Sequence, residues 1–198
     1  MLERCFDMKR DATVERKTKE TDITLNLCLD GGEVSVNTGI GFFDHMLEAF
    51  AVHGGFGLTA QVDGDLRVDG HHTVEDTGIV LGQAFARALG DKGGVARFGS
   101  LQLPMDETLA TAAVDISGRP FIVLDAMFSE QRVGDFDTCL TMEFFRAFAY
   151  NAGITLHLRI EYGCNAHHMI EALFKAAAHA LRMAVAPAVG VLSTKGSL

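Results

Sequence analysis

Two copies of a His-His-x-x-Glu motif offer the clearest chemistry in this chain. They hold four of its eight histidines and comprise His71, His72 and Glu75 in the first copy and His167, His168 and Glu171 in the second. Imidazole nitrogens and carboxylate oxygens are common ligands of divalent metals. A duplicated cluster of these groups predicts a metalloenzyme whose site is assembled from two related halves.

Each motif opens an alanine-rich stretch that is predicted to be helical. Residues four positions apart lie on the same side of a helix, so His71 can converge with Glu75, and His167 with Glu171. The adjacent residue, His72 or His168, must point to another side of its helix. Each motif is therefore expected to serve two metal ions, and the two motifs together to supply parts of both sites.

Ligand chemistry alone leaves the metal open. Imidazole suits zinc, iron and nickel, whereas added carboxylates favour harder ions such as manganese. The residue order differs from His-Glu-x-x-His, which argues against a standard zinc peptidase. His53, His157 and His179 belong to no duplicated motif. We interpret these three as mainly structural, with His53 near the site.

Cationic and hydroxyl side chains elsewhere in the chain could hold a phosphate group. They are Arg97 in a glycine-rich segment, Arg119 at a tight turn, Lys175 one helical turn after Glu171, and Ser193 and Lys195 near the C-terminus. Paired guanidinium groups with ammonium and hydroxyl donors are suited to a phosphate.

The elements that must position these residues occur twice. In the first half, alternating and apolar patterns predict strands 20–31, 33–37 and 56–62, and helices 42–52 and from 71 onward. In the second half they predict strands 107–118, 120–125 and 154–161, and helices 137–151 and from 167 onward. This alignment places His45 opposite Glu143. Each half follows the order strand-strand-helix-strand-helix.

The duplication predicts an α+β fold in which the helices of one half pack against those of the other. We expect the first repeat to span residues 1–95 and the second 96–198, within one compact domain. Hydrophobic residues make up 48% of the chain, enough for a sizeable core.

Charge and composition exclude several classes of function. The formal net charge of −9 disfavours nucleic-acid binding through a basic surface. There is no run of about 18 apolar residues, so no membrane-spanning helix is expected. The four cysteines form no C-x-x-C pair and the first twenty residues have no apolar core of a signal peptide, which favours a cytoplasmic protein.

Further motifs accompany the paired histidines, and all of them occur in one order along the chain. They lie at residues 38–47, 53–54, 69–76, 97–99, 115–120, 131–134, 167–176 and 193–196. Together these motifs resemble the imidazoleglycerol-phosphate dehydratase family of histidine biosynthesis. The resemblance runs from about Arg16 to the C-terminus.

The resemblance implies roles for individual residues. The positions that match manganese ligands are His45, His71, His72, Glu75, Glu143, His167, His168 and Glu171. Many family members have histidine where this chain has Glu143. The positions that match substrate or phosphate ligands are Glu20, His45, His53, Arg97, Arg119, Lys175, Ser193 and Lys195. Glu171 and Glu20 are the expected acid–base residues.

The resemblance also implies a reaction and an assembly. The expected reaction converts imidazole glycerol phosphate to imidazole acetol phosphate through an imidazolate and a diazafulvene-like intermediate, with two manganese ions per active site. The expected fold is a duplicated second domain of ribosomal protein S5, in a 24-subunit shell whose sites are shared between subunits. The alternatives are another di-metal lyase or hydrolase, and a non-catalytic metal-binding module.

Overall fold

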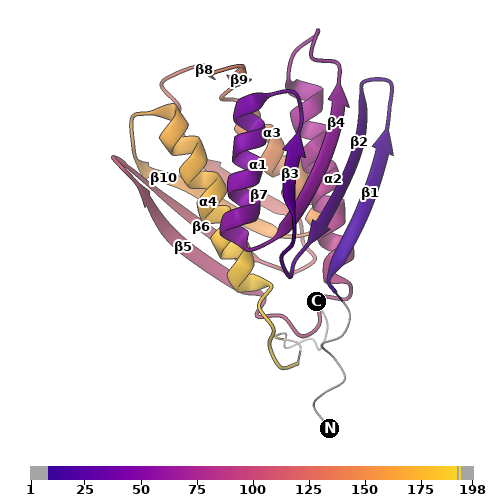
Figure 1. Ribbon diagram of the computed structural model, residues 1–198. Coiled ribbons are helices and arrows are strands. Elements are labelled where there is room, and N and C mark those ends of the chain that lie inside the picture. Colours follow the sequence, from indigo (N-terminus) through magenta and orange to yellow (C-terminus); the bar gives the residue numbers. More distant parts are fainter. Residues whose placement is uncertain (1–8, 191, 193–198) are drawn as a thin grey trace.

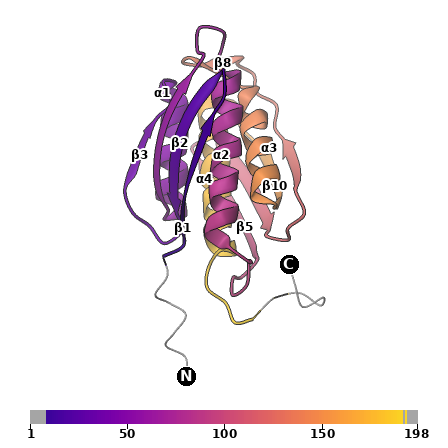
Figure 2. The same cartoon turned by 90° about the vertical axis from the view of Figure 1, so that its right-hand side faces the viewer.

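The computed structural model describes residues 9–190 and 192 of the 198-residue chain. Within these residues, two four-stranded sheets form the outer layers and four helices lie between them (Figures 1 and 2). The expected α+β fold is confirmed, and the helices of the two halves pack against one another as predicted.

The two large sheets share one topology. The first has the order β1-β2-β4-β3 and contains β1 (Asp11–Lys17), β2 (Thr21–Cys28), β3 (Val34–Asn37) and β4 (Gly57–Gly64). The second has the order β5-β6-β10-β7 and contains β5 (Phe98–Met105), β6 (Thr108–Asp115), β7 (Phe121–Asp125) and β10 (Thr155–Tyr162). In both sheets the last pair of strands is parallel and the other pairs are antiparallel. The internal repeat of the sequence is thus a repeat of structure.

The helices form the inner layer. They are α1 (Gly41–Gly54), α2 (His71–Leu89), α3 (Leu140–Ala152) and α4 (Ala166–Ala184). α2 covers the first sheet and α4 covers the second, while α2 packs on α3 and α1 packs on α4. Each helix pair therefore joins the first half of the chain to the second.

Alternating burial explains why the strands face the helices. In β2 the side chains of Ile23, Leu25 and Leu27 are buried, while residues between them are exposed or partly exposed. Buried phenylalanines fill the space between the helices, and the rings of Phe144 and Phe174 stack with centroids 5.0 Å apart. Burial of this apolar surface is the main stabilising contribution to the fold.

The structure contains strands that the sequence patterns did not reveal. β1 and β5 each precede the predicted strands of their half, and each lies at an edge of its sheet. A short hairpin of β8 (Arg132–Val133) and β9 (Phe136–Asp137) precedes α3. The prediction that this helix begins at residue 137 was wrong, because Asp137 pairs with Arg132 in the hairpin.

Among the described residues, none of the helices has the length and apolarity needed to cross a membrane.

Candidate functional site

Both His-His-x-x-Glu motifs lie in the first turns of helices, as predicted. The amide of His71 donates a hydrogen bond to Asp69 Oδ1 at the start of α2. At the start of α4, Asn165 Oδ1 accepts hydrogen bonds from the amides of His167 and His168. These side-chain caps satisfy amides that have no partner within the helix and so fix where each motif begins.

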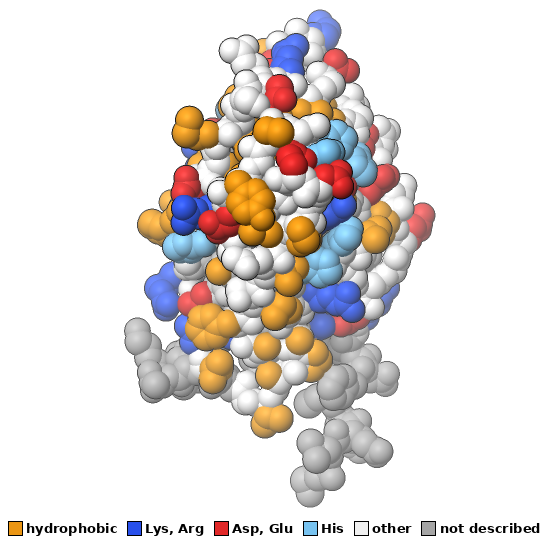
Figure 3. All heavy atoms as spheres, turned by 90° about the vertical axis from the view of Figure 1, so that its left-hand side faces the viewer, with side chains coloured by type: hydrophobic (Ala, Val, Ile, Leu, Met, Phe, Trp, Pro, Cys, Tyr) orange, Lys and Arg blue, Asp and Glu red, His pale blue; other side chains and the backbone are white. Residues whose placement is uncertain are grey.

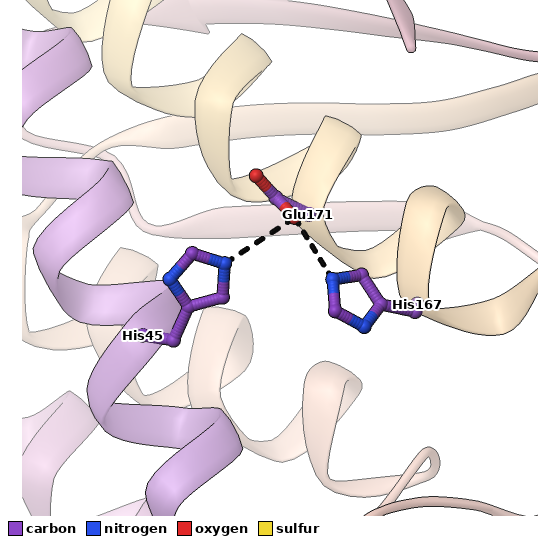
Figure 4. Close-up of side chains that lie close together, drawn as sticks. All are labelled: His45, His167 and Glu171. Atoms are coloured by element: carbon purple, nitrogen blue, oxygen red, sulfur yellow. Dashed lines mark hydrogen bonds and ion pairs between the residues drawn. The ribbon is translucent and has the colours of Figure 1, made fainter. Parts of the chain in front are cut away.

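The first candidate metal cluster consists of His45, His167 and Glu171. Figure 4 shows both imidazole rings turned toward the carboxylate from different helices. Glu171 Oε2 lies 3.4 Å from His45 Nε2 and 3.1 Å from His167 Nε2. One ligand atom from each of the three residues lies within 4.8 Å of the others. The cluster joins α1 of the first half to α4 of the second.

The second cluster consists of His71, Glu75 and Glu143, again with ligand atoms within 4.8 Å of one another. His71 Nε2 lies 3.9 Å from Glu75 Oε2, one helical turn apart on α2. Arg146 forms ion pairs with both carboxylates of this cluster, Glu75 and Glu143. The guanidinium balances the negative charge that Glu143 adds.

The two clusters are related by the internal repeat. Each combines a histidine and a glutamate from one motif with one side chain from the other half, which is His45 on α1 or Glu143 on α3. The packing of α1 on α4 and of α2 on α3 brings these parts together. The alignment that placed His45 opposite Glu143 is confirmed by these equivalent positions.

His72 and His168 belong to neither cluster. His72 Nδ1 lies 3.0 Å from Asp65 Oδ2, and His168 Nδ1 lies 2.7 Å from Glu107 Oε2. Hydrogen bonds to these carboxylates raise the pKa of both histidines. The prediction that the second histidine of each pair points to another side of its helix is confirmed.

Both clusters fit a divalent cation by the chemistry of their donors. Mixed imidazole and carboxylate ligands suit first-row divalent metals, and three protein ligands leave coordination positions for other ligands. The first cluster is partly sheltered, since Glu171 is only 6% exposed while His45 and His167 reach the surface. Figure 3 shows histidine side chains at the surface beside acidic and basic groups.

Lys175 continues the polar row of α4 beyond the first cluster. Its ammonium lies 2.6 Å from Glu171 Oε1. Burial raises the pKa of Glu171, but Lys175 and the nearby imidazoles outweigh burial and leave that pKa below its ordinary value. Glu171 is therefore ionised at neutral pH, as a metal ligand must be.

Two expected phosphate ligands meet at Asp115. Arg97 donates a hydrogen bond of 2.7 Å from Nε to Asp115 Oδ1, and Arg119 lies 3.6 Å from Asp115 Oδ2. Arg97 also donates to the carbonyl of Leu192. Ser193 and Lys195 lie outside the described residues.

His53 lies on α1, two turns beyond His45, and pairs with His179, which the sequence patterns indicated to be mainly structural. His53 Nδ1 and His179 Nε2 are 3.2 Å apart. Burial lowers the pKa of both rings, and Lys175 lowers the pKa of His53 further. Glu171, Lys175 and His179 follow one another at intervals of four residues on α4, so they lie on one face of the helix. This spacing in the sequence could have predicted that His179 lies near the site.

Glu20 lies outside both clusters, with its carboxylate 3.9 Å from His72 Nε2 and its side chain 53% exposed. The sequence patterns did not single out Asp65, Glu107 or Arg146. Asp65 contacts His72 and Glu107 contacts His168 across different elements, and Arg146 contacts Glu75 on another helix and Glu143 three residues away, so no duplicated motif contains them.

A family model and the sequence relatives of this chain all point to one enzyme family. The model of the family described as imidazoleglycerol-phosphate dehydratase matches residues 38–181. The enzyme of that name from Symbiobacterium thermophilum is 60% identical over 194 residues, covering 96% of this chain and 93% of the relative. The one from Methylorubrum populi is 57% identical and covers 96% of this chain and 100% of the relative.

Solved structures agree with the sequence relatives. The crystal structure of imidazoleglycerol-phosphate dehydratase from Staphylococcus aureus has a TM-score of 0.82 at 41% identity, covering 89% of this chain and 99% of that one. The structure from Pyrococcus furiosus, in complex with (S)-C348, has a TM-score of 0.83 at 38% identity, with coverages of 93% and 100%. With its duplicated fold and paired histidine clusters, the chain belongs to the imidazoleglycerol-phosphate dehydratase family.

Proposed function

We propose that this chain dehydrates imidazole glycerol phosphate to imidazole acetol phosphate in histidine biosynthesis. The observation that carries the proposal is the pair of imidazole–carboxylate clusters, built from both halves of a chain of this family. The proposal extends to a cytoplasmic enzyme, in keeping with the spacing of its cysteines.

The proposed cofactor is two manganese ions per active site. The proposed ligands are His45, His71, His72, Glu75, Glu143, His167, His168 and Glu171. Bound divalent ions supply positive charge that stabilises the deprotonated form of a coordinated group. The carboxylates among the ligands favour manganese over softer ions.

The phosphate end of the substrate needs cationic and hydroxyl donors. Arg97 and Arg119 both lie at Asp115, and Arg97 donates a hydrogen bond to the carbonyl of Leu192. We assign binding of the substrate and its phosphate to Glu20, His45, His53, Arg97, Arg119, Lys175, Ser193 and Lys195. Guanidinium groups bind phosphate oxygens in pairs and orient the ligand.

Dehydration also requires a base for the proton on carbon and an acid for the departing hydroxyl. Glu171 and Glu20 are the carboxylates proposed for these proton transfers. Glu171 is sheltered between two imidazoles and Lys175. Glu20 is exposed, so it is free to approach a ligand.

The proposed sites are completed by neighbouring subunits. His72 and His168 belong to neither cluster of their own chain, which supports a role at sites shared in a 24-subunit shell. In this assembly each chain would supply clusters to one site, and His72 and His168 to another.

The test is an assay of purified protein with imidazole glycerol phosphate and manganese. We expect imidazole acetol phosphate to form without release of inorganic phosphate. A glycerol phosphate that lacks the imidazole should not react. Release of phosphate, or equal turnover of the substrate without an imidazole, would favour a different di-metal hydrolase or lyase.

Arg119→Ala provides a second arm of the same assay. Loss of a phosphate ligand should raise KM more than it lowers kcat, because substrate binding is weakened. Asp125→Ala, which alters an exposed side chain on the neighbouring strand β7, serves as the control. An unchanged KM in Arg119→Ala would reject the phosphate-binding role.

A further inference from the structure

Two carboxylates with no assigned role contact His72 and His168, the histidines outside the clusters, through the same ring nitrogen. Asp65 lies 3.0 and 3.2 Å from His72 Nδ1 through its two oxygens. Glu107 Oε2 lies 2.7 Å from His168 Nδ1. The other ring nitrogen, Nε2, lies 3.9 Å from Glu20 in His72 and 3.7 Å from Asp106 in His168, which is too far for a hydrogen bond in either case.

The identity of the bound nitrogen matters for metal binding. A neutral imidazole carries one N–H and one lone pair, and a hydrogen bond from one nitrogen to a carboxylate decides which nitrogen has the lone pair. Metal-binding histidines commonly donate their second N–H to a carboxylate, which fixes the tautomer and ring orientation.

We propose that Asp65 and Glu107 are positioning residues that keep His72 and His168 in the Nδ1–H tautomer and present Nε2 to a divalent cation. The inference rests on the proposed function, because it assumes that both histidines are metal ligands. It adds Asp65 and Glu107 as residues that would affect metal binding by orienting the histidine ligands.

The internal repeat supports the assignment, because in each half a carboxylate bonds the Nδ1 of the second motif histidine, although the carboxylates come from different positions. Glu20 and Glu107 occupy equivalent positions, each followed by a threonine that begins β2 or β6. In the first half, the loop 65–70 after β4 provides Asp65 for His72. In the second half, the loop 163–165 after β10 has no carboxylate, and the carboxylate that contacts His168 comes instead from Glu107.

The environments of the two equivalent glutamates, Glu20 and Glu107, differ. Glu107 Oε1 accepts hydrogen bonds from the amides of Cys164 and Asn165, at 3.3 and 3.0 Å, so its position is fixed. The hydrogen bond from His168 and these amides hold the pKa of Glu107 well below its usual range. In the first half Asp65 bonds the Nδ1 of His72, and the equivalent Glu20 lies 3.9 Å from His72 Nε2 with a side chain that is 53% exposed. The repeat thus places one glutamate in a hydrogen-bonded position and leaves its counterpart exposed.

The test measures manganese affinity of the assembled protein by titration calorimetry. Asp65→Ala and Glu107→Ala should each weaken binding by about tenfold to hundredfold, the usual effect of removing a hydrogen-bond partner of a metal-binding histidine. Asp65→Asn and Glu107→Gln keep an oxygen that can accept the Nδ1–H, so they should retain most of the affinity. Asp63→Ala, an exposed carboxylate two residues from Asp65, controls for loss of charge.

Asp65 provides the decisive comparison if Glu107→Ala disturbs the loop that Glu107 also anchors. Among the described contacts, the Asp65 carboxylate accepts a hydrogen bond from His72 alone. Wild-type affinity in a folded Asp65→Ala protein would overturn the inference. A wild-type protein that binds manganese but does not dehydrate the substrate would instead overturn the proposed function, and the affinity comparison would still stand.

Discussion

At the scale of single residues, neighbouring carboxylates change the protonation of His72 and His168. Asp65 raises the pKa of His72, and Glu107 raises the pKa of His168. In the metal-free protein these ion pairs contribute stability that is fully present below the ordinary histidine pKa of about 6.5. That stability is lost as the pH rises through the raised pKa values. Metal binding has the opposite pH dependence, because a metal ligand must lose its proton.

Manganese affinity should therefore fall as the pH is lowered, starting above pH 6.5. Below its pKa, each protonated histidine ligand should reduce the affinity by about tenfold per pH unit. Titration calorimetry at about pH 8 and pH 6 measures the difference. Equal affinities at the two pH values would show that His72 and His168 are not ligands.

The sequence predicted part of the site at this scale. The pairs His71 with Glu75 and His167 with Glu171 follow from helical spacing, which is a local property. The contacts of Arg146 with Glu75 and of Glu107 with His168 depend on packing between elements. A pattern in one segment cannot predict them.

The packing of α2 on α3 sets the position of the second cluster at the scale of elements. Gly78 and Gly82 of α2 face the backbone of α3, and a Cβ added at Gly82 would lie 2.6 Å from the carbonyl oxygen of Phe148. α3 carries Glu143, so the closeness of these helices decides where that carboxylate meets His71 and Glu75.

Gly82→Ala should destabilise the protein. Alanine favours a helix by about 1 kcal/mol over glycine, but forcing the two helices apart costs roughly 1–3 kcal/mol or more. We expect a lower apparent Tm in thermal unfolding and weaker manganese binding. Gly41→Ala is the matched control, because a Cβ there meets nothing within 4 Å. A Gly82→Ala protein as stable as the wild type would refute the close packing.

Sequence patterns predicted the central strands and helices but not the edge strands. β6 alternates throughout between buried and less buried positions, and β2 does so as far as Leu27, which is the pattern of a half-buried strand. In β1 only Val14 is fully buried, and β5 contains Gly99 and Pro104. An edge strand pairs on one side only and tolerates such residues, so its pattern is weak.

At the scale of the whole molecule, the duplicated fold leaves two histidines of the motifs outside the clusters of their own chain. His72 and His168 start α2 and α4, and they lie outside the clusters formed within the chain. The family resemblance implied shared sites, and the divergent directions of adjacent histidines supply a physical reason. The number of subunits cannot be derived from one chain, because it depends on contacts between copies.

The proposed sharing of sites between subunits predicts complementation between inactive variants. His45→Ala disrupts a cluster, and His168→Ala removes a proposed ligand outside the clusters, so each variant alone should be inactive. Co-expressed chains should form some sites that combine an intact cluster from one chain with an intact His168 from the other. We expect the mixed assemblies to regain activity, with a mixture of His45→Ala and His167→Ala as the control, since both changes damage the same cluster. Mixed assemblies that stay inactive would argue that each chain builds its own site.

The most direct test of the account is dehydration of imidazole glycerol phosphate by protein stripped of metal with a chelator and then resupplied with manganese. The paired clusters predict that stripping abolishes formation of imidazole acetol phosphate and that manganese restores it, with two ions bound per active site by elemental analysis. Full activity in protein that elemental analysis finds free of divalent metal would contradict the account.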